Sequence, residues 1–308
     1  MKKNILLLLV SFAFILPVVA QPGGGLLDEL DALDSNVEKE PDYAFATFKG
    51  VRVINGQSVE APAKGELLYM LAHRFGTIEN GFYDMFGMDR ATMRMGLEYT
   101  LPTDFVTIGY GRSTYGKTYD GFVKAKLFRQ QSGAKNFPVT IVWVSDVAVR
   151  SEKFTNPDRK NYFTSRMAYM HQLLIARKFS SSFSVQLSPT LVHKNLVHTI
   201  DEQNTFFSMG VGSRLKLTRR VSLNLEYFGF MPGQNIPKIG DQTIRNTFAV
   251  GFDIETGGHV FQLQFTNARA MYDGGYISET VNDFAAPQGK GIAFGFNLTR
   301  TFSFKRFE

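Results

Sequence analysis

TMRMGLEYTLPTDFVTIGYGR, residues 92–112, contains two runs in which apolar residues alternate with polar or small ones. Met93, Met95, Leu97 and Tyr99 alternate with Thr, Arg, Gly and Glu in the first run. Alternation with a period of two places the two sets on opposite faces of a β-strand. The proline and aspartate of the intervening LPTD end strands and favour a turn. The stretch therefore predicts a β-hairpin with one apolar and one polar face.

The same pattern recurs along the chain, and the connections between the runs are alternately short and long. Bacterial outer-membrane barrels have short periplasmic turns, long outer loops and an even number of strands. We therefore predict an all-β protein, a closed antiparallel transmembrane β-barrel of about twelve strands in the bacterial outer membrane. The expected strands are 65–75, 91–100, 104–112, 119–130, 137–149, 161–177, 182–193, 204–217, 220–230, 243–255, 259–267 and 289–304.

The last expected strand reads GIAFGFNLTRTFSF and lies close to the end of the chain. A barrel in lipid must close, because an open sheet edge would leave backbone groups without hydrogen bonds. We expect this strand to pair with residues 66–75. Its aromatic residues are typical of the signal that such barrels present to the barrel-insertion machinery, which is an expected partner together with outer-membrane lipid.

The residues before the barrel divide into three expected parts. Residues 1–20 have two lysines, a short apolar run and small residues at the end, which indicates an export signal peptide. Residues 21–42 are rich in acids and form a periplasmic leader, which is either solvated or bound to a periplasmic partner. Residues 43–64 contain a strand-like run and the turn signal Asn55-Gly56, and form either an extra strand or a plug. The barrel itself is expected over residues 65–308.

Composition restricts the possible chemistry. The chain has no cysteine, which excludes disulfides, thiolate nucleophiles and a lipoprotein anchor. It has 34 Lys and Arg against 28 Asp and Glu, and the acids concentrate in the leader, so the barrel is basic. A basic body suggests a small anionic solute as a partner. Nothing indicates a nucleic-acid partner, a metal site or a cofactor.

Function is expected on the polar strand faces, which would line the lumen. Rings of Arg and Lys in a channel favour anions, whereas in a narrow barrel such residues pair across the lumen and fill it. Both alternatives stay open. The inward candidates, in which bases outnumber acids, are Arg94, Glu98, Lys124, Lys126, Arg166, Gln172, Arg214, Lys216, Glu226 and Asp253, together with Asn224.

No catalytic motif is present in the chain, so we expect no catalytic residues and no enzyme. His171 is an exception that deserves an alternative, because it shares its face with apolar residues and a polar group facing lipid is costly. A Ser–His pair on that face would suggest a lipid-acting hydrolase, although Ser165 is too far along the strand to be the partner. His193 and His198 are only a weak metal signal.

Several longer segments carry a resemblance to a known family: FATFKGVRVINGQSVE, LLYMLAHRFG, FYDMFGMD, GYGRSTYGKTYDGFVKAKLFRQ and FGFNLTRTFSF. The resemblance extends over nearly all of the chain after the signal. The chain resembles a family of predicted bacterial outer-membrane β-barrel proteins of unknown function. The resemblance implies the fold and the location and carries no catalytic residues.

Three functional hypotheses follow. The first is an outer-membrane barrel that serves as a small-solute channel, with a preference for anions, or as a structural barrel that docks a partner. The second is the outer-membrane lipid-acting hydrolase suggested by His171. The third is a soluble secreted β-barrel that holds a lipid, with the apolar strand faces turned inward.

Overall fold

The computed structural model describes residues 40–154, 156–158, 160–197 and 199–303. The predicted signal peptide and the predicted acidic leader, except its last three residues, lie outside the described residues. Among the described residues, no helix is long and apolar enough to cross a bilayer.

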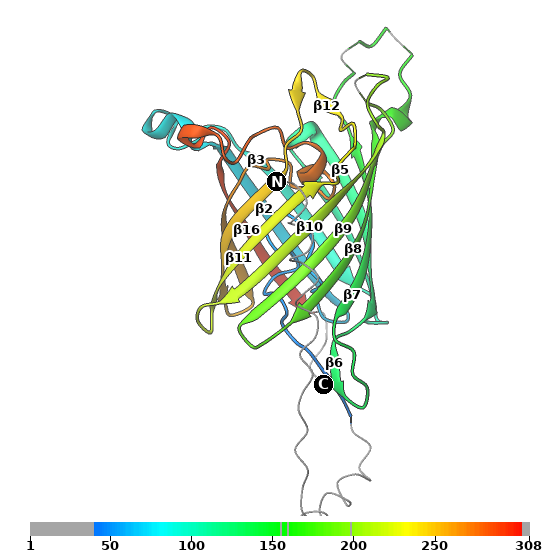
Figure 1. Ribbon diagram of the computed structural model, residues 1–308, viewed down its shortest axis with the longest axis vertical. Helices are drawn as coiled ribbons and strands as arrows, with labels where there is room; N and C mark the ends of the chain where they lie inside the picture. Colours follow the sequence, from blue (N-terminus) through cyan, green and yellow to red (C-terminus); the bar gives the residue numbers. More distant parts are fainter. Residues whose placement is uncertain (1–39, 155, 159, 198, 304–308) are drawn as a thin grey trace, which may run out of the picture. The chain divides into compact units, whose positions relative to one another are not determined.

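Twelve antiparallel strands form a closed barrel, which confirms the predicted fold (Figure 1). Neighbouring strands follow one another along the chain, and the last strand closes the barrel on the first. The strands are β2 (Glu66–Thr77), β3 (Thr92–Thr100), β4 (Val106–Ser113), β5 (Thr118–Phe128), β7 (Thr140–Arg150), β8 (Met167–Lys178), β9 (Phe183–Lys194), β10 (Thr205–Lys216), β11 (Val221–Phe230), β14 (Thr247–Thr256), β15 (His259–Thr266) and β16 (Ala293–Ser303).

The closing pair confirms the predicted partner of the last strand. β16 runs antiparallel to β2, with Ser303 opposite Glu66 and Phe296 opposite His73. Phe294 of β16 stacks on Phe75 of β2, with ring centroids 5.8 Å apart. The seam therefore has both backbone pairing and aromatic contacts, as an interior strand pair has.

Short connections gather at one end of the barrel, here called the turn end, and long ones at the other, the loop end (Figure 1). Between β14 and β15, the turn residues Gly257 and Gly258 both have positive φ, 44° and 95°. Only glycine adopts that conformation freely, and it suits a two-residue hairpin. The connection between β5 and β7 is longer than predicted, because residues 131–133 form β6 (Gln131–Gly133), which pairs with β1 (Pro41–Tyr43).

The loop end carries the other small elements. They are η1 (Ile78–Asp84), η2 (Tyr115–Lys117), η3 (Phe163–Arg166), the hairpin of β12 (Lys238–Ile239) and β13 (Gln242–Thr243), α2 (Gly275–Ser278) and η4 (Pro287–Gly289). The loop that contains η1 leaves Phe82 and Tyr83 exposed.

The two faces of the wall differ as the alternation predicts. Met95 and Ile108 point outward and are 44% and 45% exposed, and many further large apolar side chains are exposed on neighbouring strands. Inward positions of the same strands, such as Arg94 and Glu98, are buried. The soluble lipid-binding alternative required the apolar faces to point inward, so it is wrong.

The barrel interior is filled by chain. Residues 44–62, here called the inner segment, are buried from Thr47 to Val59 apart from the partly exposed Lys49, and contain no strand. Its apex is the predicted Asn55-Gly56 turn, where Val53 N–H donates to the Gly56 carbonyl at 2.9 Å. Residues 267–292, here called the inner loop, connect β15 to β16, and residues 267–280 of this loop are buried apart from Arg269.

An apolar cluster packs the inner segment and inner loop against the wall, which the polar-face expectation did not include. Phe48, Val53 and Ile54 of the inner segment and Ile277 of the inner loop belong to it. The wall contributes Phe122, Val142, Val144, Met170, Leu174, Ala176, Val192, Phe206, Phe228 and Ala249. The interior therefore has a protein-like core beside its polar groups.

Candidate functional site

Most of the predicted lumen residues point into the barrel interior. They do not surround an open passage, because each lies among side chains or backbone of the filled interior. The buried members are Arg94, Glu98, Lys124, Gln172, Arg214, Asn224, Glu226 and Asp253.

Three predicted residues lie elsewhere. Arg166 belongs to the 3-10 turn η3, because β8 begins only at Met167 rather than at residue 161. Lys126 sits at a β-bulge near the end of β5 and pairs with the turn residue Asp104 at 3.7 Å. Lys216 is half-buried at the last position of β10. Lys126 and Lys216 keep the inward register, opposite Val142 and Ser222, but lie near strand ends and are only half-buried, whereas Arg166 precedes its strand.

Other charged residues in the interior were not predicted. Arg94 Nε donates to Asp120 at 3.0 Å, and Arg52 holds both oxygens of Asp273 at 2.5 and 3.0 Å. Asp120 lies at an inward strand position, so parity would have found it. Arg52 and Asp273 lie outside the strands, and no periodic signal marks them.

The charge balance of the interior also differs from the expectation. Among the described residues, the buried bases inside the barrel are Arg52, Arg74, Arg94, Lys124 and Arg214, and the acids are Glu98, Asp120, Asp146, Glu226, Asp253 and Asp273. The predicted excess of bases over acids in the lumen is therefore absent from the buried part.

The inner segment is held by wall side chains that bind its backbone. The Glu226 carboxylate accepts hydrogen bonds from the N–H groups of Ile54, Asn55 and Gly56 at 3.0–3.1 Å. Gln186 accepts from Val59 N–H and donates to the Gln57 carbonyl, at 3.0 and 2.8 Å. Further wall residues contribute similar bonds, among them Arg214, Asn224, Gln262 and Asn297. The Glu226 carboxylate thus fixes the Asn55-Gly56 turn, because it accepts hydrogen bonds from three consecutive N–H groups there.

The apex of the inner segment also meets the inner loop. Arg52 and Gln57 both bind the Asp273 carboxylate. Near this junction the remaining cavity measures about 10 Å³ and is lined in part by Arg52, Arg74 and Asn297. That is about the smallest space that can hold one water molecule. The described interior is therefore almost completely filled at this level.

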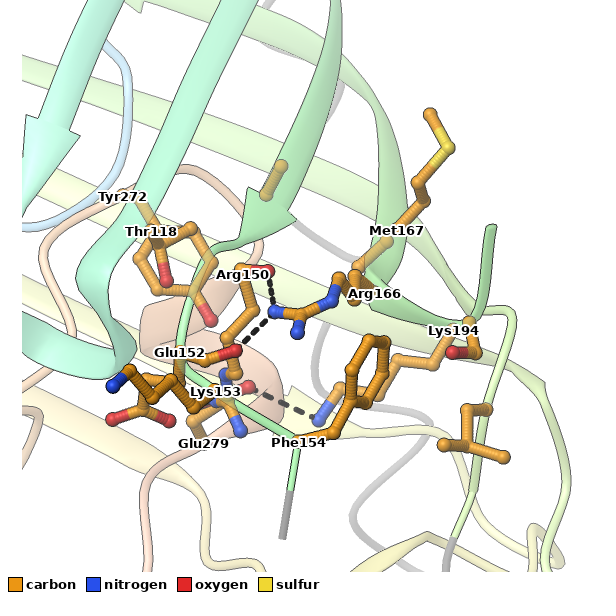
Figure 2. Close-up of a pocket in the computed structure, with 14 residues that line it drawn as sticks. Thr118, Arg150, Glu152, Lys153, Phe154, Arg166, Met167, Lys194, Tyr272 and Glu279 are labelled. Carbon is orange, nitrogen blue, oxygen red and sulfur yellow. Dashed lines mark hydrogen bonds and ion pairs between the residues drawn. The ribbon is translucent and has the colours of Figure 1, made fainter. Parts of the chain in front are cut away.

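A larger pocket, here called the vestibule, opens at the loop end (Figure 2). It measures about 290 Å³, and its lining comes from β5, β7, β8 and β9, the inner loop, the loop between β7 and β8 and the loop between β9 and β10. The lining residues are Thr118, Ala148, Arg150, Glu152, Lys153, Phe154, Ser165, Arg166, Met167, Ala168, Lys194, Leu196, Tyr272 and Glu279.

Charged side chains dominate the vestibule. Glu279 of the inner loop pairs with Arg150 at 2.5 Å and with Lys194 at 3.4 Å. Arg166 donates to the carbonyls of Arg150 and Glu152 (Figure 2). Burial and the neighbouring Glu279 carboxylate raise the pKa of Tyr115, beside the vestibule, to about 12.

On the outer face, His171 has a partner on the neighbouring strand. Ser145 Oγ of β7 lies 3.0 Å from His171 Nδ1 of β8, and the His171 ring stacks on Trp143 with centroids 6.2 Å apart. His193 Nδ1 lies 2.7 Å from Thr205 Oγ1. His198 lies outside the described residues, and among the described ones no three metal-binding side chains come together.

Solved structures resemble the barrel in outline. The NanC porin is 7% identical and matches over 78% of this chain and 100% of its own, with a TM-score of 0.48. An outer membrane channel from Pseudomonas putida F1 is 12% identical over 79% of this chain and 98% of its own, also at 0.48. Omp33 of Acinetobacter baumannii is 9% identical over 79% and 100%, at 0.38. These likenesses carry no argument about solute or activity.

No curated protein sequence matches the chain. A family model described as a membrane-bound β-barrel domain matches residues 48–302, which include the inner segment from Phe48 onward and nearly all of the barrel. That range confirms the resemblance expected from the sequence. The chain belongs to this family of membrane-bound β-barrel domains (DUF5777).

Proposed function

We propose that the protein is a small-solute channel of the bacterial outer membrane, closed in the conformation described above. Membership in a membrane-bound β-barrel family and an N-terminus typical of exported proteins support the location. The observation that carries the proposal is the way the lumen is closed. Two chain segments fill it, whereas the wall is lined at many positions by short side chains such as Ser188, Ser208 and Ser222.

Part of the filling suits a removable occluder. Each neutral hydrogen bond between the inner segment and the wall contributes only about 0.5–1.5 kcal/mol net, because water replaces it on opening. Both carboxylate oxygens of Glu98 and of Asp146 are buried without a hydrogen-bond partner among the described residues. Such groups are costly in a permanently dry interior, and water entering an open lumen would satisfy them. The apolar cluster opposes opening and makes the closed form the resting state.

A disulfide lock tests the proposal. A Cβ atom built on Gly212 of β10 lies 3.6 Å from Val53 Cβ of the inner segment. That separation falls within the range of about 3.5–4.5 Å found in disulfides. The chain has no cysteine of its own, so Val53→Cys with Gly212→Cys would form the only bridge. We expect the wild type and the reduced double variant to open in planar bilayers, and the oxidised double variant to stay closed.

The two single-cysteine variants are the controls, because each carries the substitution without the bridge. A deletion of residues 44–62 is a second route, with a higher and permanent conductance expected where the barrel folds. If the wild type, the reduced double variant and the folded deletion variant are all silent, the channel proposal is wrong. The structural or partner-docking barrel is then the remaining hypothesis.

The Ser145–His171 contact supports a second candidate, a lipid-acting hydrolase. A serine activated by histidine is a nucleophile, and both residues lie on the lipid-facing side. Catalysis would also need a third group to orient the ring and donors for the oxyanion. In the described part of the chain, Ser145 is the hydrogen-bond partner of His171. Release of fatty acid from phospholipid vesicles, lost in Ser145→Ala, would establish this function, and equal release by both proteins would remove it.

A further inference from the structure

The vestibule contains more positive than negative charge. Its charged lining residues are the bases Arg150, Lys153, Arg166 and Lys194 and the acids Glu152 and Glu279. Because the low-dielectric walls of a cleft focus the field of its charges, an excess of bases concentrates anions there. The buried lumen shows no such excess, so the vestibule is the place where the basic character of the barrel is available to a solute.

The pairing of these charges leaves cationic donors free for a ligand. A single carboxylate, Glu279, serves both Arg150 and Lys194. The Arg150 side chain is still 40% exposed beside its partner, whereas Glu279 is only 7% exposed. Arg166 donates to backbone carbonyls, which carry no net charge to neutralise it. Because the four bases face only two carboxylates, Glu152 and Glu279, an anion entering the pocket would meet a net positive charge.

The remaining walls are mostly apolar. The Arg166 guanidinium lies over the Phe154 ring, 3.7 Å from its centroid, and Met167 and Leu196 line the same pocket (Figure 2). The volume of about 290 Å³ is close to the lower limit of roughly 300 Å³ for small-molecule pockets. A ligand that fits combines one negative group, which an arginine fork can bind, with a small apolar body.

We propose that the vestibule binds small organic carboxylates at the loop end of the barrel. The proposal rests on the channel function above and names its substrate class. The carboxylate binds between Arg166, Arg150 and Lys153, and the apolar part of the ligand contacts Phe154 and Leu196. The site would select solutes before they reach the inner loop, whose Glu279 forms part of the pocket.

Equilibrium binding to the full protein, refolded in detergent micelles, tests this proposal. The probes are benzoate, its neutral isostere benzamide and inorganic phosphate, and binding is followed by titration calorimetry. We expect saturable binding of benzoate, with benzamide at least about tenfold weaker, the factor that corresponds to losing one charge-assisted hydrogen bond. Phosphate is expected to bind more weakly than benzoate, because it lacks the apolar body.

Variants locate the site. Lys153→Gln and Arg166→Gln should each weaken benzoate binding by about threefold to tenfold, since each removes one cation from the pocket. Lys160→Gln is the matched control, because Lys160 belongs to the same loop, lies over Tyr162 and does not line the pocket. It should leave the affinity within about twofold of the wild type.

Several results would overturn the proposal. They are the absence of saturable benzoate binding, equal affinity for benzoate and benzamide, tighter binding of phosphate than of benzoate, and equal losses in Lys160→Gln and the pocket variants. Binding in micelles does not depend on conduction, and the disulfide lock does not depend on benzoate. If the protein binds benzoate but never conducts, only the channel proposal is wrong. If it conducts but does not bind benzoate, only the proposed ligand class is wrong.

Discussion

The inner segment and the vestibule belong to the same barrel and are organised in opposite ways. The inner segment is held through its backbone, by wall side chains such as Glu226 and Gln186, and leaves almost no space. The vestibule is built from charged side chains that pair only partly and leave about 290 Å³ between them. Backbone held by fixed acceptors closes a lumen, whereas free charged side chains around a space provide a binding site.

The two regions should also contribute differently to folding stability and to ligand binding. Bonds from one carboxylate to three N–H groups are lost together when that carboxylate changes. Of the vestibule charges, Glu152 and Lys153 are exposed, so each contributes little to stability and can be replaced singly. Substitutions in the inner segment should therefore change the folding stability, and substitutions at such exposed vestibule positions should change binding alone.

The largest effect is expected for Asp273→Ala, which breaks the contact between the inner loop and the inner segment. It leaves the buried Arg52 guanidinium without its carboxylate, which costs about 3–5 kcal/mol of unfolding free energy. Urea unfolding from lipid vesicles measures the loss. Asp104→Ala, which removes an exposed pair with Lys126, should cost less than about 1 kcal/mol. Similar losses in the two variants would show that the buried Arg52–Asp273 pair contributes no more to stability than an exposed pair does.

The same pair predicts a pH dependence. Burial disfavours the charge on Asp273, but the Arg52 guanidinium outweighs it, so the pKa of Asp273 lies below its ordinary value of 3.8. The ion pair therefore stabilises the protein fully above pH 3.8, and this contribution is lost as the pH falls through the lowered pKa. The stability difference between the wild type and Asp273→Ala should shrink in that acidic range. A difference that does not change there contradicts the prediction.

A smaller effect is expected for Glu226→Gln, which keeps one acceptor oxygen and loses the charge. The N–H groups of Ile54, Asn55 and Gly56 then share a weaker acceptor, at a cost of about 1–3 kcal/mol. Amide hydrogen exchange should become faster at these three residues. Thr299→Ala is the control, because the Thr299 hydroxyl binds the wall at Val260. Faster exchange in the control as well would mean a general loosening of the barrel.

On the outer face, the smallest change in stability is expected. Replacing Ser145 and His171 together by Ala and Leu removes two polar groups that satisfy each other, and such a double change is close to neutral. Removing Ser145 alone leaves the imidazole unpaired toward lipid and should cost about 1–3 kcal/mol. Urea unfolding from vesicles distinguishes the two. An equal loss in both variants would assign the residues a structural role beyond their mutual bond.

The alternation of inward and outward residues along each strand, here called strand parity, is what lets the sequence predict the barrel wall. Met95 and Ile108 alternate with Arg94 and Gly109, so the outward and inward faces follow from period two, and the closing partner of the last strand follows from the need to close the sheet. The inward positions of Arg94 and Glu226 follow from the same rule. The domain division before the barrel and the functional roles of the inward residues stay predictions.

Parity does not reach residues outside regular strands. Arg52 and Asp273 lie in segments without periodicity, and their pairing joins positions far apart in the chain, so no local signal marks it. The run from residue 161 predicts a strand that includes Arg166, although residues 163–166 form a 3-10 turn. The vestibule gathers residues from four strands and three loops, and only the folded barrel brings them together.

The closure of the sheet has a consequence for how the molecule is assembled. The inner segment leads directly into β2 and the inner loop leads directly into β16, so the two occluding pieces are tethered to the two edges of the final seam. That seam joins Glu66 to Ser303, almost the full length of the described chain, and contacts of such long sequence separation form late and slowly. The inner segment and the inner loop would enter an open sheet more easily than a closed barrel. We therefore expect the last step of membrane insertion to couple two events. The pairing of β16 with β2 closes the barrel while the inner segment and the inner loop already lie inside it.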